Sequence, residues 1–516
     1  MVLLSWKKKQ IMSKILKLEK LKAQVKKEKS KNKKIVLCHG VFDLIHIGHI
    51  KHFKEARKNG DFLIVSITSD KFVNKGSGRP IFNQSFRAEF LSSLSNIDAV
   101  FVNDYPTSEK LISNIKPNIY FKGPDYKDNK KDSTKNIYKE ITSTKKFGGK
   151  VIYSNDITFS SSNLINTHSN YFNDEQKNFI KKISKKYSFS FIEKKIKQLK
   201  KLKVLLVGET IIDQYIFGDV LGKSGKEPHL VLNEKLQETY LGGAAAIANH
   251  LITFSKSVNF ITLAGKEKQY FLFIKKLLKK NITTNFFSKP SGKTIIKKRY
   301  IDEVSKNKLL GVYSIDEEKL KDSSEKKLIS QIKKQTKICD LILVSDYGHG
   351  LISKKTANEF NRSKTFFSLN AQINASNRGF HSLIKYKNID SLIINENELR
   401  HEMRDKVGNI EKMGHELMKF LRIKKLIITR GNKGAMLIDD NGKAFTAPAF
   451  ANKLVDKVGA GDTMLAVISL CMKIKLPGDL SLFLGSLAGA IAVENIGNST
   501  FIDKDELIRK IQFSIK

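Results

Sequence analysis

The feature that most constrains this chain is a repeated alternation of short apolar segments with amphipathic helical segments. In the stretch that starts at Lys34, the segments expected to be strands are residues 35–38, 62–68, 99–102, 119–121 and 151–153. In the stretch that starts at Lys203, they include residues 341–344, 391–394 and 425–429. Strands and helices that alternate in this way form parallel sheets covered by helices. The sequence therefore predicts an α/β protein with two sheets.

The domain boundaries follow from the places where this alternation stops. With about 150 residues per domain, 516 residues suggest two or three domains. The two stretches share no repeated sequence, so we expect two unlike domains rather than a duplication. The expected segments are a basic helix in residues 1–32, a first α/β domain in 33–166, a lysine-rich helical linker in 167–202 and a second α/β domain in 203–516.

Composition restricts the partners and the compartment. The 93 basic and 51 acidic residues leave a net charge of +42, which suits phosphorylated substrates or nucleic acid. The lysines are spread along the whole chain, which favours solvated surfaces over a nucleic-acid site. The three cysteines form no CxxC pair, and no run of 18 apolar residues occurs. We therefore expect a cytoplasmic protein with no membrane span and no nucleic-acid partner, and self-association into a homo-oligomer stays open.

Two histidines mark a candidate phosphate site in the first domain. His46 and His49, with Gly48 between them, lie where the first strand passes into a helix. A spacing of three places both imidazoles on one face of the first helical turn. Free N–H groups at a helix start favour anions, and Gly40 and Gly48 allow a ligand to approach the backbone. These residues predict a site that binds a phosphate.

The string GVFDLIHIGH at residues 40–49 resembles the HxGH signature of the cytidylyltransferase-like nucleotidyltransferases. The resemblance extends from Lys34 to Asn166, and it is nearest to the sugar-phosphate adenylyltransferases of bacterial heptose-nucleotide synthesis. It implies that His46 and His49 stabilise the transition state at the α-phosphate. It also implies a phosphate- and nucleotide-binding role for the residues Gly40, Phe42, Gly48, Lys122, Ser160, Ser161 and Ser162.

The resemblance leaves two nucleotides, ATP and CTP, open for this first domain. Some relatives that use CTP carry an arginine shortly before the Ser/Thr motif, whereas this chain has Asp-Ile-Thr-Phe at 156–159. The difference favours ATP and leaves CTP as the alternative.

A second candidate site lies in the string DKVGAGDTMLA at residues 456–466. Gly459 and Gly461 allow the backbone N–H groups around Ala460 to point into one concavity, which a helix starting near Thr463 would close. Asp462 would lie beside that positive helix end. A carboxylate there can accept a proton from an attacking hydroxyl while the N–H groups hold a phosphoryl group.

The same string resembles the ribokinase/PfkB carbohydrate-kinase signature, and further landmarks of that family follow in order across residues 203–516. The resemblance implies sugar binding by Asp213, Gly242, Gly243 and Asn249. It implies that Asn395 and Glu398 form the NxxE element associated with Mg²⁺ and phosphate, with Glu398 the metal-binding residue, through water if not directly. It implies nucleotide binding by Thr429, Gly431 and Gly434.

Together the two halves resemble the HldE-type bifunctional enzymes, although the order of the domains is reversed. The resemblance implies that the kinase half phosphorylates the anomeric hydroxyl of a sugar phosphate such as heptose 7-phosphate, with ATP and Mg²⁺. It implies that the other half joins a sugar 1-phosphate to a nucleotide and releases pyrophosphate. Ala246 stands where the family has an asparagine, which leaves the sugar open. Two alternatives remain: only one half is catalytic and the other is a sensing module, or the chain is a basic nucleic-acid-binding protein.

Overall fold

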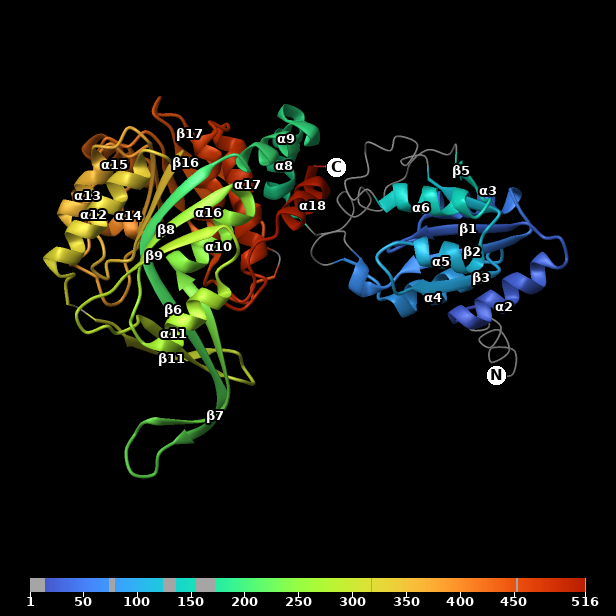
Figure 1. The fold of residues 1–516 in the computed structure, drawn as a ribbon, viewed down its shortest axis with the longest axis horizontal. Coiled ribbons are helices and arrows are strands. Elements are labelled where there is room, and N and C mark those ends of the chain that lie inside the picture. Colours follow the sequence, from blue (N-terminus) through green and yellow to red (C-terminus); the bar gives the residue numbers. More distant parts are fainter. Residues whose placement is uncertain are drawn as a thin grey trace. The chain divides into compact units, whose positions relative to one another are not determined.

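The computed structural model divides the chain into two units, one up to residue 171 and one from Phe172 to Ile515. The residues it describes are 14–73, 79–123, 136–154, 172–316, 318–451 and 453–515. Each unit contains its own β-sheet, and together these sheets confirm the expected α/β class (Figure 1).

The first unit contains a five-stranded parallel sheet in the order β3-β2-β1-β4-β5. The strand order reverses beside β1, and ligands of open α/β sheets bind at the carboxyl ends of the strands next to such a point. The expected strands of this half are confirmed as β1 (Ile35–Gly40), β2 (Phe62–Thr68), β3 (Ala99–Asn103), β4 (Ile119–Lys122) and β5 (Lys150–Tyr153).

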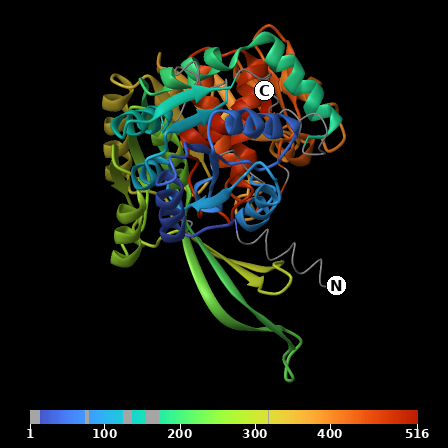
Figure 2. The same cartoon turned by 90° about the vertical axis from the view of Figure 1, so that its right-hand side faces the viewer.

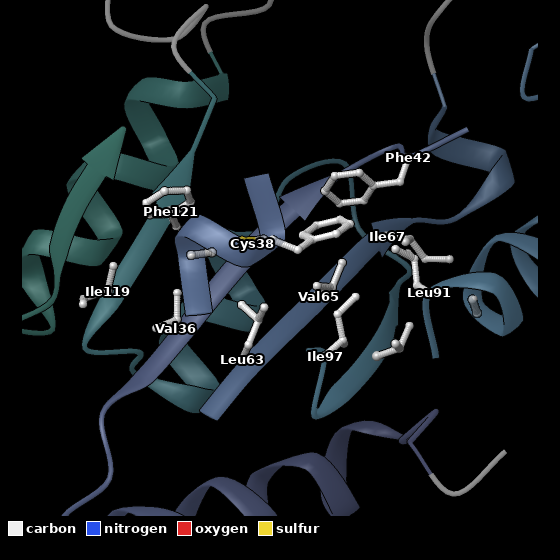
Figure 3. Close-up of a cluster of buried hydrophobic side chains, with 14 residues drawn as sticks. Val36, Cys38, Phe42, Leu63, Val65, Ile67, Leu91, Ile97, Ile119 and Phe121 are labelled. Carbon is white, nitrogen blue, oxygen red and sulfur yellow. The ribbon is translucent and has the colours of Figure 1, made fainter. Parts of the chain in front are cut away.

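Helices cover both faces of this sheet because its central strands are buried on both sides. One apolar cluster joins Val36 and Cys38 of β1 to Val65 of β2, and Phe42 lies at its edge, just after β1 (Figure 3). On the other face, Leu21 and Val25 are buried, so the N-terminal basic helix packs on the sheet. The helices are α2 (Leu18–Lys29), α3 (Ile47–Lys58), α4 (Gln84–Ser92), α5 (Glu109–Ile115) and α6 (Asn136–Lys146).

The second unit contains a twelve-stranded mixed sheet. Its central path runs β11-β10-β6-β12-β13-β14-β15-β16-β17, with β8 and β7 also paired to β6 and β9 paired to β8. The strands are β6 (Lys203–Lys223), β7 (Leu230–Gly243), β8 (Ser257–Leu263), β9 (Ile282–Phe287), β10 (Ile296–Asp302), β11 (Lys308–Ser314), β12 (Leu341–Asp346), β13 (Phe366–Ala371), β14 (Ser391–Asn395), β15 (Leu426–Thr429), β16 (Ala435–Ile438) and β17 (Ala444–Ala447).

Strand β6 is 21 residues long and takes part in two portions of the sheet. Its first residues pair in parallel with β8 and β12, whereas the residues from Thr210 onward pair with β7 and β10. The long β6–β7 hairpin projects from the rest of the unit in both views (Figures 1 and 2). Residues 218–228 lie at the end of this hairpin.

The structure corrects the expected linker at residues 167–202. Two of the eleven described helices of this unit, α8 and α9, lie within it. From Phe172 onward, the expected linker belongs to the second unit: Phe172 packs on Phe450, and the hydroxyl of Tyr187 donates to Asp479 at 2.9 Å. Their apolar faces pack against this domain, which is why they are not a free linker. The helices are α8 (Asp174–Lys186), α9 (Phe189–Leu199), α10 (Ala244–Phe254), α11 (Lys268–Leu277), α12 (Asp322–Thr336), α13 (Lys354–Asn361), α14 (Glu396–Glu402), α15 (Ile410–Leu421), α16 (Ala460–Lys473), α17 (Gly478–Ala492) and α18 (Lys504–Ile515).

Among the described helices, none combines the length and the apolar content needed to cross a lipid bilayer.

Candidate functional site

The histidines of the first unit stand at the start of α3, as expected. His46 is the N-cap residue, and its Nδ1 accepts the N–H of Gly48 at 3.1 Å. In a neutral imidazole this bond leaves the proton on Nε2, so Nε2 is a donor. The rings of His46 and His49 stack with centroids 3.9 Å apart. The two imidazoles therefore form one polar surface beside the first turn of α3.

Phe42 supports this pair. Its backbone has a φ of +47°, and its ring lies so close to Gly40 that a Cβ there would be 3.1 Å from the ring. The Phe42 ring also meets the edge of the His49 ring, with centroids 5.4 Å apart. A Cβ at Gly40 would force the Phe42 ring to move by a few tenths of an ångström, and this ring contacts His49.

Lys122 lies at the carboxyl end of β4, beside the end of β1. Its ammonium donates to the carbonyl of His39 at 3.2 Å and pairs with Glu140 at 3.3 Å. Burial opposes ionisation of Glu140, but Lys122 and the N–H of Ser108 hold its pKa well below the usual range. The charge that Lys122 offers to a phosphate is therefore partly neutralised inside the domain. Ser160, Ser161 and Ser162 lie outside the described residues.

Two arginines fix the loop that leads into α3. Arg79 pairs with the buried carboxylate of Asp43. Arg87 is fully buried and donates to the carbonyls of Val41 at 2.5 Å and Thr68 at 2.9 Å. Both side chains hold residues 41–43 in place, so they support the histidine pair through the backbone.

The second unit brings Asp213 and the double glycine together. Asp213 on β6 accepts a hydrogen bond from Arg299 on β10 at 2.6 Å. A Cβ at Gly242 would lie 2.2 Å from an Asp213 carboxylate oxygen, so only glycine fits beside it. Gly243 has a φ of +58° and precedes α10. These contacts place the buried carboxylate of Asp213 against the buried backbone of the double glycine.

Asp462 lies in the first turn of α16. The helix begins at Ala460, three residues earlier than the expected Thr463, so Ala460 and Gly461 are already helical. The phenol of Tyr347 donates to Asp462 at 2.9 Å, yet burial raises the pKa of Asp462 to about 7. The first N–H groups of a helix have no internal partner and favour anions. A carboxyl that titrates near neutrality therefore stands beside an anion-binding helix start.

The loop before α16 is held by Asp456. This carboxylate accepts the phenol of Tyr215 at 2.7 Å and the ammonium of Lys308 at 2.6 Å. Gly459, the N-cap residue, has a φ of +89°, and a Cβ there would meet the side-chain oxygen of Asn498. The glycine is thus required by both conformation and space.

A buried carboxylate pair fixes the loop that carries Tyr347. Glu209 accepts the N–H groups of Tyr347 at 3.0 Å and Leu351 at 3.3 Å, and burial together with the nearby Asp346 raises its pKa to about 7. Asp346 pairs with Lys385 at 2.7 Å. Glu209 therefore fixes the backbone of residues 347–351, and this holds the Tyr347 phenol against Asp462.

Asn249 does not face this site, which corrects the expectation that it binds sugar. It is fully buried in α10, where its amide donates to the carbonyl of Leu277 at 3.0 Å and accepts the N–H of Lys279 at 2.9 Å. Both ends of the side chain are satisfied by backbone after α11. Asn249 therefore stabilises that turn instead of contacting a ligand.

Asn395 and Glu398 form a capping box at the start of α14. Asn395 accepts the N–H of Glu398 at 2.9 Å, and Glu398 accepts the N–H groups of Asn395 at 2.7 Å and Ile373 at 3.2 Å. Burial raises the pKa of Glu398 to about 7. Each carboxylate oxygen can accept a second contact, and hard oxygen donors suit Mg²⁺. Glu398 alone therefore offers one carboxylate that would suit Mg²⁺ or one of its water ligands, since the described residues contain no group of three or more His, Cys, Asp or Glu side chains placed to hold a metal ion.

The expected nucleotide loop follows β15. Thr429 ends this strand, and Gly431 and Gly434 have φ values of +60° and +82°. A Cβ at Gly434 would lie 2.0 Å from the carbonyl of Ala447. Arg430, which lies between Thr429 and Gly431, pairs with Glu396 of α14 at 3.0 Å. The salt bridge joins the loop after β15 to the start of α14.

Sequence reasoning missed four residues of the second site: Tyr347, His349, Lys297 and Arg299. Tyr347 and His349 directly follow the apolar strand at residues 341–346, a position where parallel sheets place ligand-binding residues. This position after a predicted strand could have identified both residues from the sequence. Lys297 and Arg299 could not be located in the same way, because their role depends on the pairing of β10 with β6, which are distant in the sequence.

The fold and these sites define two classes of domain, a Rossmann-like nucleotidyltransferase domain and a ribokinase-like sugar-kinase domain. The chain belongs to the pfkB family of carbohydrate kinases, whose model matches residues 201–505. Residues 37–168 match the cytidylyltransferase-like family.

Relatives of this chain include proteins that are named as bifunctional. The "Bifunctional protein HldE" of Desulfatibacillum aliphaticivorans is 26% identical over 317 residues, which are 60% of this chain and 63% of that protein. The protein of the same name from Geotalea uraniireducens is 40% identical over 116 residues, 22% of this chain and 24% of that protein. The longer alignment thus spans less than two thirds of the relative. These are distant homologues with the reverse domain order.

Solved structures resemble the second unit in fold. Phosphofructokinase-2 from Escherichia coli has 14% identity and a TM-score of 0.49, with 61% of this chain and 100% of that chain covered. Ribokinase from Thermotoga maritima has 20% identity and a TM-score of 0.47, with 60% and 99% covered.

Proposed function

We propose that this chain is a bifunctional enzyme of nucleotide-sugar synthesis. Its second unit phosphorylates the anomeric hydroxyl of a sugar phosphate similar to heptose 7-phosphate, and its first unit joins a sugar 1-phosphate to a nucleotide, with ATP as the favoured donor. The observation that carries the proposal is Asp462 at the start of α16, with a raised pKa. The histidine pair of the HxGH string at the start of α3 supports the nucleotidyltransferase activity of the first unit.

The kinase step requires a base and an anion site. Asp213 and the backbone at Gly242 hold hydroxyls of the sugar. Asp462 accepts the proton of the attacking hydroxyl, whose oxygen bonds to the γ-phosphorus of ATP as the bond to the β-phosphate oxygen breaks and ADP leaves. The N–H groups at the start of α16 stabilise the transferred phosphoryl group.

The transferase step requires no covalent nucleophile. A sugar 1-phosphate oxygen attacks the α-phosphorus of the nucleotide, and pyrophosphate leaves. His46 and His49 donate to the oxygens of the α-phosphate, where negative charge spreads in the transition state. Lys122 adds positive charge at the same end of the sheet.

Mg²⁺ would be carried to the kinase site mainly by the triphosphate and water, and would neutralise charge on the phosphate oxygens. Glu398 would hold the ion or a water bound to it.

A product assay tests the proposal. The protein is incubated with ATP, Mg²⁺ and a panel of sugar phosphates and sugar 1-phosphates, and the products are identified by mass spectrometry. We expect a sugar bisphosphate with ADP from the kinase, and a nucleotide sugar with pyrophosphate from the transferase. If no sugar in the panel is modified while ATP binds, the assigned reactions are wrong.

The kinase rate should depend on pH through Asp462. The base must be ionised, and the pKa of its carboxyl is raised to about 7. We expect kcat/KM to reach a plateau above pH 7 and to fall about tenfold per pH unit below it. Tyr347→Phe removes the hydrogen bond that favours the ionised form, so the midpoint of the profile should move to higher pH. A profile that does not move in this variant would assign the midpoint to another group.

A further inference from the structure

His250 is a buried histidine that the two proposed reactions do not use. It lies in α10 and is 1% exposed. Its Nδ1 accepts the backbone N–H of Ile502 at 3.3 Å, and its Nε2 lies 3.2 Å from Oγ1 of Thr463. Burial lowers the pKa of His250 to about 3, so the ring is neutral near pH 7. Because Nδ1 of this neutral ring is an acceptor, the proton is on Nε2, which donates to the Thr463 hydroxyl.

The Thr463 hydroxyl connects this imidazole to the N-cap residue of α16. Its Oγ1 donates to the carbonyl of Gly459 at 2.9 Å. The backbone N–H of Thr463 donates to the same oxygen at 3.0 Å. An unbroken series of hydrogen bonds therefore runs from Ile502 through His250 and Thr463 to Gly459, and each donor in it has a defined acceptor.

The carbonyl of Gly459 matters because it shares a peptide plane with the N–H of Ala460. The atoms of a peptide unit are nearly coplanar, and in the trans form the C=O and N–H bonds point in opposite directions. Two hydrogen bonds that fix the carbonyl of Gly459 therefore also fix the direction of the Ala460 N–H. Ala460 is the first residue of α16, where the N–H groups have no partner within the helix. Asp462, the proposed base, lies in the same turn.

The backbone on both sides of the imidazole is held by other contacts. Ile502 lies in the segment between α17 and α18, in which Gly497 donates its N–H to Asp456 at 3.1 Å. On α10, the preceding residue Asn249 is bound to backbone after α11. The ring of His250 is therefore a fixed support against which the first turn of α16 is placed.

We propose that His250 is a positioning residue for phosphoryl transfer, which holds the first N–H groups of α16 and Asp462 in their reactive geometry through the hydroxyl of Thr463. The inference rests on the sugar-kinase activity proposed above, and it adds a residue that acts without contacting the sugar or ATP. A displacement of about 1 Å in reacting groups can cost about 10²-fold in rate. A hydrogen bond that sets the direction of one peptide at the helix start can therefore control turnover.

Steady-state kinetics test this role. His250→Phe keeps a ring without hydrogen-bonding nitrogens, and Thr463→Val keeps the shape of the side chain without its hydroxyl. We expect each to lower the kcat of sugar phosphorylation by about 10- to 100-fold and to change KM by less than about threefold, because the substrates are bound mainly by other elements. His250→Gln, whose amide can donate to Thr463, should recover part of the lost rate. An unchanged kcat in His250→Phe would overturn the proposal.

The variant that combines His250→Phe with Thr463→Val shows whether the imidazole acts through the hydroxyl. If it does, the second substitution removes a contact that is already lost. The kcat of the combined variant should then lie within about threefold of the slower single variant. Losses that multiply would show that the two side chains act independently, which contradicts the proposal.

The matched control removes a buried hydroxyl from α16 away from its start. Ser469 lies in the same helix and is hydrogen-bonded to Ser368 of β13 at 2.7 Å. Ser469→Ala should lower the thermal midpoint, because a buried hydrogen bond is lost, but it should keep the wild-type kcat. An equal loss of kcat in Ser469→Ala would show that turnover follows the stability of the whole helix, and not the position of its first turn.

Hydrogen exchange tests the positioning without requiring turnover. The exchange of the Thr463 N–H, which is bonded to Gly459, is followed by mass spectrometry of a peptide that contains it. It should be about tenfold faster or more in His250→Phe and unchanged in Ser469→Ala. If the wild type phosphorylates no sugar while exchange rises in His250→Phe, the proposed reaction fails and His250 still holds the helix start. If the wild type is active and His250→Phe changes neither exchange nor kcat, the reaction stands and the positioning role fails.

Discussion

Asp462→Asn is expected to abolish sugar phosphorylation while nucleotidyl transfer continues at the wild-type rate. The asparagine keeps the size of the side chain and can still accept from the Tyr347 phenol, but it cannot take the proton of the attacking hydroxyl. Loss of general-base assistance lowers a rate by about 10²- to 10⁴-fold. Steady-state ADP release, with pyrophosphate release measured on the same sample, shows both activities.

A matched variant distinguishes loss of the catalytic base from the loss of any acidic residue at the start of a helix. Asp479 also lies in the first turn of a helix, α17, where it contacts Lys186 and Tyr187. Asp479→Asn removes a comparable charge from the same unit and should keep kinase turnover. Near-normal turnover in Asp462→Asn, or an equal loss in Asp479→Asn, would remove Asp462 from the role of base.

The short glycine motifs could be placed from the sequence because their function lies in local backbone geometry. Gly459 needs a left-handed conformation and Gly242 leaves no room for a Cβ. The close contact at Gly242 is with Asp213 of β6 and could not be derived from the local sequence, whereas the turn at Gly459 could be recognised from its neighbours. The same holds for His46 and His49, whose positions depend on one strand-to-helix turn.

What the sequence could not supply depends on contacts between distant segments. Lys297 and Arg299 meet Asp213 only because β10 pairs with β6. Asn249 looked like a ligand residue because it follows the double glycine, but its amide is used by backbone near residue 278. A helical turn after a motif does not reveal which face its side chains present. The sequence predicted that the segment containing α8 and α9 is helical. That these helices belong to the second unit could be seen only from tertiary contacts such as that of Phe172 with Phe450.

The charge of +42 led to a competing hypothesis that the histidines also test. A nucleic-acid-binding protein would owe its affinity to many distributed lysines, and that affinity would fall steeply with added salt. Removing one histidine would change it little. An enzyme that binds an α-phosphate at the start of α3 would instead have a lower rate of nucleotidyl transfer when either imidazole is removed.

We therefore expect His46→Ala and His49→Ala each to lower the rate of nucleotidyl transfer by about 10²- to 10³-fold, with a much smaller change in triphosphate affinity. The contacts of these imidazoles strengthen as charge develops on the α-phosphate, so their loss affects the transition state more than the bound nucleotide. His46→Ala also removes the side chain that accepts the N–H of Gly48, so a small loss of stability is expected there.

The matched control is His52→Ala, one turn further along α3, where the ring packs against Phe121 with centroids 5.0 Å apart. It removes an imidazole from the same helix without removing one from its first turn, so pyrophosphate release should stay close to the wild-type rate. Single-turnover pyrophosphate release, nucleotide binding and duplex binding at two salt concentrations are measured on the same samples. Because only the transition-state contacts distinguish the two hypotheses, pyrophosphate release that is unaffected in both His46→Ala and His49→Ala would exclude the HxGH assignment, whatever the outcome of the binding assays.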